Sequence, residues 1–156
     1  MYKRRFSLIS ITMVGVLMGA VALVRSAGSK PDLEALLKQA DVKFVTLSDG
    51  TIVAPWRGDA GSWMVIIAYD DETHVIVTAV QVCKIERSRL DGGLASKLLE
   101  LNGTSYPVKT ALAGDTVCAA SGIPANMATP QLLRYICEAT VAMADAVKSV
   151  VSGDVT

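Results

Sequence analysis

The sequence contains a single histidine, His74, and this scarcity excludes a metal site built from several histidine ligands. The acidic run Asp70-Asp71-Glu72 precedes His74, and it lacks the alternating spacing and the distant glutamate of a calcium-binding loop. We interpret the run as a solvated turn and His74 as a surface residue. No G-x-G-x-x-G, P-loop or G-x-S-x-G pattern is present. The sequence therefore predicts a protein that is not an enzyme and that uses no metal or cofactor.

Cysteine is also scarce. The three cysteines are Cys83, Cys118 and Cys137, and their spacings match no C-x-x-C metal or redox motif. Because the number is odd, the chain cannot pair all of its cysteines internally. Each cysteine lies in an apolar stretch, which favours buried free thiols that pack as small hydrophobic side chains. One disulfide between two of them is the alternative.

The chain has a net charge of zero, but its charged residues are unevenly distributed. The chain has fifteen basic and fifteen acidic side chains. Four of the basic residues precede Ala27, in a stretch without acidic residues: Lys3, Arg4, Arg5 and Arg25. The remainder is net acidic, so the sequence predicts no nucleic-acid partner.

Residues 1–27 form a predicted targeting segment, followed by a linker at residues 28–30. A run of nineteen residues from Phe6 to Val24 contains no charge, and at the helical rise it spans about 28 Å, close to the hydrocarbon thickness of a bilayer. Ala20-Val21-Ala22 resembles a signal-peptide cleavage site, whereas the continuation of the run favours a retained anchor helix through residues 6–24. Both alternatives place the rest of the chain in the periplasm or otherwise outside the cytoplasm, secreted or anchored to the membrane.

Residues 31–152 are predicted to form one α+β domain. Asp-Gly and Gly-Asp turns separate β-rich runs, and apolar residues at spacings of three and four indicate helices. The expected elements are a helix that Pro31 opens and that extends to Ala40, strands at Val42–Leu47, Thr51–Trp56, Trp63–Tyr69 and His74–Val82, a helix at Gly93–Asn102, strands at Pro107–Leu112 and Thr116–Ser121, and a helix at Pro130–Val151. We expect a mostly antiparallel sheet with the last helix packed across one face, burying Leu133, Ile136, Ala144 and Val147.

The strands Trp63–Tyr69 and His74–Val82 show little alternation between apolar and polar residues. Either other elements cover both faces of the sheet, or one face meets a partner. We predict a protein-binding surface or homodimer contact formed by Trp63, Val65, Ile67, Val75, Val77 and Ala79. Trp56 belongs to the same candidate surface because it brackets one turn together with Trp63. The alternative, which the residue type favours, is that both tryptophans are core residues.

Several of these segments resemble the bacterial YbjN family of sensory transduction regulators and, through it, the type III secretion chaperone-like fold. The resemblance is carried by the Leu33 helix, the hairpin at Asp49-Gly50, the Val65-Ile66-Ile67 strand, the L-L-E-L-N run at Leu98–Asn102, the hairpin at Ala113-Gly114-Asp115 and the T-P-Q-L-L start of the last helix. It implies a protein-binding module that is often dimeric, and it supplies no catalytic residues.

The resulting functional hypothesis is a non-catalytic protein- or peptide-binding module, chaperone-like or regulatory, on the outer side of a membrane. The alternative is an extracytoplasmic sensor domain for a small ligand. A closed apolar pocket with converging polar groups would favour the sensor, and an open apolar face would favour the binding module.

Overall fold

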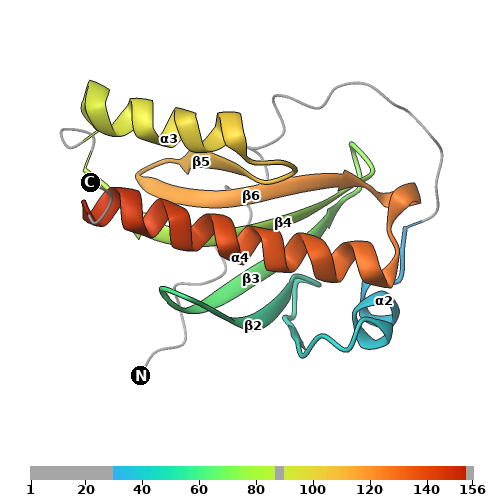
Figure 1. Ribbon diagram of the computed structural model, residues 1–156. Helices are drawn as coiled ribbons and strands as arrows, with labels where there is room; N and C mark the ends of the chain where they lie inside the picture. The colour runs from blue at the N-terminus through green and yellow to red at the C-terminus, as the bar shows by residue number, and fades with distance from the viewer. Residues whose placement is uncertain (1–29, 87–89, 154–156) are drawn as a thin grey trace.

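The computed structural model describes residues 30–86 and 90–153 (Figure 1). Its elements are helix α2 (Leu33–Gln39), strands β1 (Val45–Thr46), β2 (Ile52–Gly58), β3 (Gly61–Asp70) and β4 (Val75–Lys84), helix α3 (Gly92–Thr104), strands β5 (Lys109–Ala113) and β6 (Thr116–Pro124), the 3₁₀ helix η3 (Ala125–Met127) and helix α4 (Pro130–Ser152). The predicted order of one helix, four strands, one helix, two strands and one helix is confirmed. The predicted hydrophobic helix at residues 6–24 lies outside the described residues. Within residues 30–86 and 90–153, no helix is long and apolar enough to cross a membrane.

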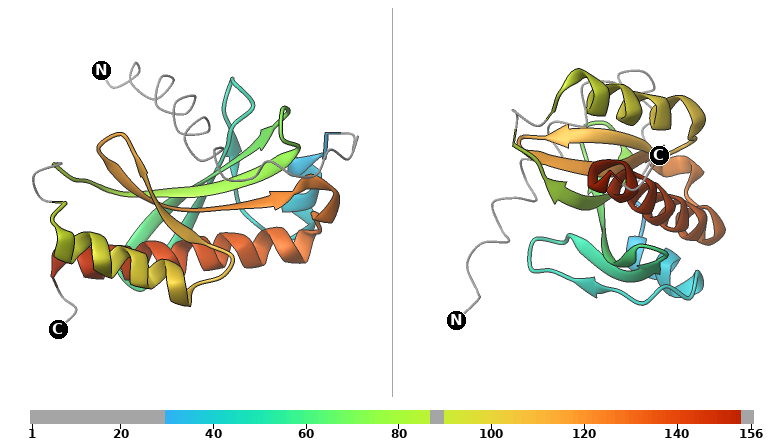
Figure 2. Two further views of the ribbon diagram at one scale, coloured as in Figure 1. Left: turned by 90° about the horizontal axis from the view of Figure 1, so that it is seen from above. Right: turned by 60° about the vertical axis from the view of Figure 1, so that its left-hand side comes forward.

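The six strands form one antiparallel sheet in the order β1-β2-β3-β4-β6-β5. The connection from β4 to β6 passes through α3 and β5, so β5 becomes an edge strand. Helices α3 and α4 lie side by side on the same side of the sheet (Figure 2). The fold is therefore a two-layer α+β arrangement, as expected from the sequence.

Helix α4 supplies most of the covering layer. The Thr129 side chain accepts a hydrogen bond from the Leu132 backbone N–H at 3.1 Å, and Pro130 occupies the first turn. Gly153 ends the helix in the left-handed conformation with φ of 79°. The four residues predicted to be buried along α4 are all at most 1% exposed: Leu133, Ile136, Ala144 and Val147.

One buried polar contact fixes the position of α4 over the middle of the sheet. The Thr140 hydroxyl lies 2.7 Å from the Ile136 carbonyl oxygen and 3.1 Å from the Thr78 hydroxyl of β4. Both threonines are fully buried. Because Thr140 donates to the carbonyl, Thr78 donates to Thr140, and no hydroxyl is left without a partner.

Three details differ from the sequence-based expectations. The first strand contains only Val45 and Thr46, because Val42 instead donates its backbone N–H to Leu37 at the end of α2. Helix α3 passes through Gly103 and ends at Thr104, because the Ser105 backbone N–H still bonds to Leu101. Helix α2 begins at Leu33, with the Asp32 side chain as its cap.

Asn102, the last residue of the L-L-E-L-N run, protects the exposed edge of β5. Its side-chain oxygen accepts the Thr110 backbone N–H at 2.5 Å, and its side-chain nitrogen donates to the Thr110 carbonyl oxygen at 3.2 Å. The amide thus replaces a neighbouring strand at this position and reduces the tendency of the edge to pair with another chain. Asn102 also lies in a glycosylation sequon with Thr104, and its amide nitrogen is already engaged within the fold.

Candidate protein-binding surface

The strand register divides the seven candidate surface residues between two faces. Ile66 of β3 lies opposite Ala79 of β4, so odd-numbered residues of β3 share a face with even-numbered residues of β4. Consequently Trp63, Val65 and Ile67 lie on one face, and Val75, Val77 and Ala79 lie on the other. The expectation that all six share one face was wrong.

The first group belongs to the core beneath α4. Val65 and Ile67 are fully buried and Trp63 is 8% exposed. Trp56 of β2 lies directly opposite Trp63 and packs, partly buried, against the same core. Of the two alternatives for the tryptophans, the structure favours the core.

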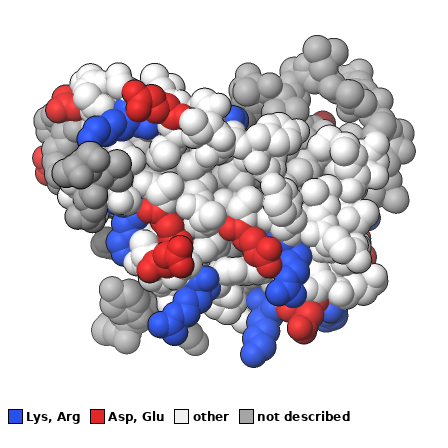
Figure 3. All heavy atoms as spheres, in the orientation of Figure 1, with Lys and Arg blue, Asp and Glu red and all other residues white. Residues whose placement is uncertain are grey.

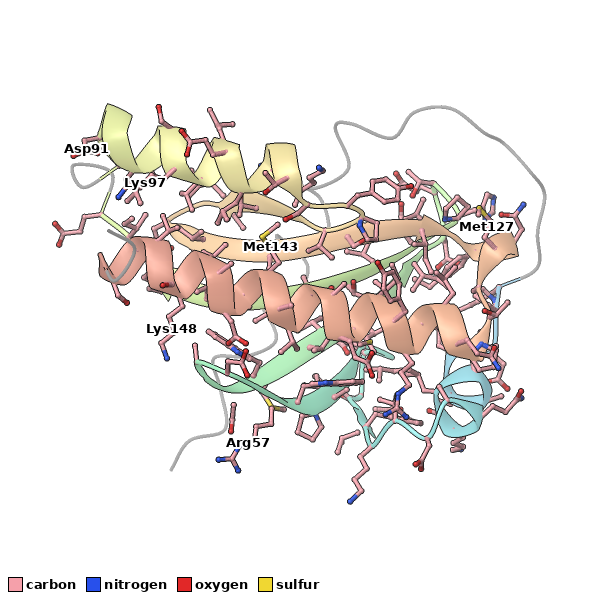
Figure 4. The ribbon with its side chains drawn as sticks, in the orientation of Figure 1. Arg57, Asp91, Lys97, Met127, Met143 and Lys148 are labelled. Carbon is pink, nitrogen blue, oxygen red and sulfur yellow. The ribbon has the colours of Figure 1, made fainter. Side chains whose placement is uncertain are left out.

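The Asp145 carboxylate of α4 holds Trp63 and the β2–β3 turn in place. It accepts hydrogen bonds from the Trp63 indole N–H at 2.7 Å, the Asp59 backbone N–H at 2.7 Å and the Ala60 backbone N–H at 3.0 Å. Lys148, one turn further along α4, extends toward the same turn and donates to the Ala60 carbonyl oxygen at 2.7 Å (Figure 4). These contacts connect the far end of α4 to a hairpin more than eighty residues earlier in the chain, and the sequence analysis missed them.

The opposite side of the sheet carries the second group, and none of the described helices lies over it (Figure 2). We call this surface the open face. Following the strand pairings, its apolar residues and glycine are Val53, Pro55, Met64, Ile66, Ala68, Val75, Val77, Ala79, Ala111, Cys118, Ala120 and Gly122. Charged and polar residues share this side and border the apolar area: Asp70 lies opposite Val75, Lys109 lies opposite Ala120, and Arg57 and Gln81 continue β2 and β4.

The small side chains of the open face lie close to the sheet backbone and form its floor, and the larger side chains project further from the sheet. Ala79, Cys118 and Ala120 pack together and are at most 4% exposed. Met64 is 54% exposed, whereas Ile66 and Val77 are partly buried. The result is an apolar surface in which two of the three candidate residues from β4, Val75 and Ala79, are already shielded by their neighbours.

A shallow hollow of about 230 Å³ lies between α3 and the edge strand β5. Its lining is mostly apolar, and Leu99 and Leu112 are exposed there. Asn102 and Thr110 are its only polar lining residues, and they bond to each other. The hollow is smaller than most ligand pockets and has no converging free polar groups, so it does not favour the sensor hypothesis.

The groups capable of chemistry are dispersed. Burial raises the pKa of the Cys118 and Cys137 thiols to about 12, which makes both unreactive at neutral pH, and all three cysteines are free thiols. The Asp70 carboxylate accepts the Glu72 and Thr73 backbone N–H groups and so closes its own turn. His74 bonds to the Tyr69 hydroxyl at 2.7 Å. Among the described residues no group of three or more histidine, cysteine or acidic side chains could hold a metal ion.

Charge gives no sign of a nucleic-acid site on the α4 side. Figure 3 shows uncharged surface across the middle of this side, with basic and acidic side chains interspersed below it, around β2 and α2. Two exposed ion pairs join basic and acidic side chains one helical turn apart, Lys38–Glu34 on α2 and Arg134–Glu138 on α4.

The close contact between Gly58 and Asp145 leads to a stability prediction. A Cβ at Gly58 would lie 2.3 Å from the Asp145 Oδ2 atom and 2.8 Å from the Val141 Cγ1 atom. We expect Gly58→Ala to lower the free energy of unfolding by about 1–3 kcal/mol, because the carboxylate must leave its hydrogen bonds. Gly103→Ala in α3 meets no atom within 4 Å and should be neutral or stabilising by about 0.5–1 kcal/mol. Urea unfolding of both variants provides the measurement, and equal stability of the two would contradict the role of Asp145.

Comparison with known proteins identifies the fold. The sequence matches no protein-family model and no curated protein sequence. Among solved structures, YbjN from E. coli aligns with a TM-score of 0.57 at 12% identity, over 78% of this chain and 90% of that chain. The Yersinia pestis type III secretion chaperone SycH, solved in complex with a YscM2 fragment, aligns with a TM-score of 0.54 at 18% identity, over 74% of this chain and 95% of that chain. A chain of the heterodimeric ExoU–SpcU complex of Pseudomonas aeruginosa aligns with a TM-score of 0.56 at 13% identity, over 76% of this chain and 96% of that chain. The predicted resemblance is confirmed at the level of the fold: this chain folds like YbjN and the type III secretion chaperones.

Proposed function

We propose that the domain is a non-catalytic protein-binding module and that its binding surface is the open face. The observation that carries the proposal is a largely apolar sheet surface, bordered by Arg57, Asp70 and Lys109, over which no described helix packs. Leaving such a surface in water is unfavourable, so a partner is expected to cover it. The structural neighbours support the proposal, because several were solved as complexes with another protein, including SycH with a YscM2 fragment and the HopA1–SchA chaperone–effector pair.

We further propose that the domain lies on the outer side of a membrane. The uncharged run at residues 6–24 and the basic residues before it support this location. No residue of the domain is assigned to catalysis, and the partner is a protein or peptide or a second copy of the chain.

Two adjacent residues of β4 provide the test of the binding surface. Val77 lies on the open face and is partly exposed, whereas Ile76 is fully buried beneath α4. We expect the Val77→Asp variant to fold, because the new carboxylate can reach water. The folded variant should no longer crosslink in cells to the proteins that crosslink to the wild-type chain, or should no longer self-associate. Ile76→Asp should unfold the domain, because it buries an unpaired carboxylate.

Circular dichroism during thermal unfolding, combined with capture of the crosslinked partner, separates the outcomes. Retention of the partner by a folded Val77→Asp variant would show that the open face is not the binding surface. Unfolding of Val77→Asp would show that this face is part of the core.

Protease treatment of intact spheroplasts tests the location. The domain should be digested without lysis, since it lies outside the inner membrane. A domain that survives until the cells are lysed would contradict the proposed location. N-terminal sequencing of the mature chain then shows whether the apolar segment is retained.

A further inference from the structure

The chain itself contains a segment that matches the open face in character. The run from residue 6 to residue 24 has no charge, and leaving it in water is unfavourable. Gly15, Gly19 and Ala22 recur at spacings of four and three, which places them on one face in a helical conformation. Such a stripe of small residues allows another backbone to approach closely.

The described chain begins near one end of the sheet. The Lys30 ammonium group lies 5.7 Å from the centroid of the Tyr69 ring, near the end of β3. Tyr69 lies opposite Ile76 and packs against the core, so this contact is on the α4 side of the sheet end. Lys30 follows Val24 by six positions, so the Val24 Cα atom lies within about 20 Å of the Lys30 Cα atom. A segment of this reach can pass around the end of the sheet to the open face, where Ala68, Val75 and Gly122 lie.

The lengths of the segment and of the open face are similar. The ten residues of β3 extend about 33 Å, and the nineteen-residue run extends about 28 Å as a helix. A segment that starts near the β3–β4 turn can therefore run along the whole open face and reach Met64 near the opposite end.

The floor of the open face suits close approach of a backbone. Ala68, Ala79 and Ala120 carry only methyl groups, and Gly122 carries none. Glycine inside a strand often marks a site where another backbone comes near. A Cβ at Gly122 would lie 3.0 Å from the Val75 Cγ1 atom, and it would raise the floor at this point.

We infer that the open face holds residues 6–24 of its own chain until this segment enters a membrane. The domain would then shield the hydrophobic segment that targets it. This inference rests on the proposed function of the open face as a protein-binding surface, and it identifies the first occupant as the chain itself.

The test uses the full chain, synthesised in a translation reaction without membranes or detergent, with a photoreactive amino acid in place of Met64. A second chain carries it in place of Tyr135, which is 51% exposed compared with 54% for Met64 but lies on α4 on the other side of the sheet. Equal amounts of isotopically light and heavy chains are mixed before irradiation, and the crosslinked peptides are identified by mass spectrometry. From position 64, we expect crosslinks to residues 6–24 that join light to light and heavy to heavy only. From position 135, crosslinks to this segment should be about tenfold fewer. A tenfold ratio corresponds to a difference of about 1.4 kcal/mol in the free energy of contact at the two positions.

A pair of double variants tests the stripe of small residues. Gly15→Leu with Gly19→Leu should reduce the crosslinks from position 64 by about tenfold, because the added side chains prevent close approach. Val14→Leu with Met18→Leu changes the neighbouring positions of the same segment and should leave the crosslinks unchanged.

Three results would overturn the inference: crosslinks that join light to heavy chains, absence of crosslinks from position 64 to the segment, or a full chain that precipitates without detergent. Each would show that the segment is not held by its own domain. If the Val77→Asp variant nevertheless loses its partner, the proposed function stands without the inference. If that variant also keeps its partner, both are wrong.

Discussion

Packing of α4 against one face of the sheet is the interaction on which the rest of the structure depends. The apolar stripe of α4 covers β2, β3, β4 and β6, and α2 and α3 pack against α4 rather than forming a second layer. The Thr78–Thr140 contact fixes the middle of the helix, and Asp145 fixes its far end to the β2–β3 turn. Because the described helices all pack on one side of the sheet, none of them covers the other side.

The fold could be predicted from the sequence because its signals are local. Thr129 and Pro130 begin α4 and Gly153 ends it, and the Asp49-Gly50 and Gly114-Asp115 turns mark two hairpins. Pro55 lies inside β2, although proline cannot donate a backbone hydrogen bond. It is tolerated because β1 pairs only with Ile52 and Val53, so the outer side of β2 is unpaired at Pro55.

The candidate surface could be predicted only in part, because face assignment depends on register. Both β3 and β4 are apolar on both faces, so their composition does not show which residues point toward the core. Four residues connect Asp70 to Val75, and this turn length sets a register in which odd positions of β3 lie opposite even positions of β4. Val65 and Val77 therefore point to opposite faces of the sheet. Asp145 could not have been identified, because its partners lie more than eighty residues away and no local motif accompanies it.

The central claim is that the two faces of the sheet have different roles, one as the core and the other as a binding surface. Ile66 and Ile67 are the same residue type at adjacent positions of β3, with Ile67 fully buried under α4 and Ile66 partly exposed on the open face. The most direct measurement is the change in free energy of unfolding when each is replaced by alanine, taken from the main urea transition. The account predicts a loss of about 2–5 kcal/mol for Ile67→Ala and about 1 kcal/mol for Ile66→Ala. Equal losses for the two variants would show that the open face is packed like the core, and would contradict the account.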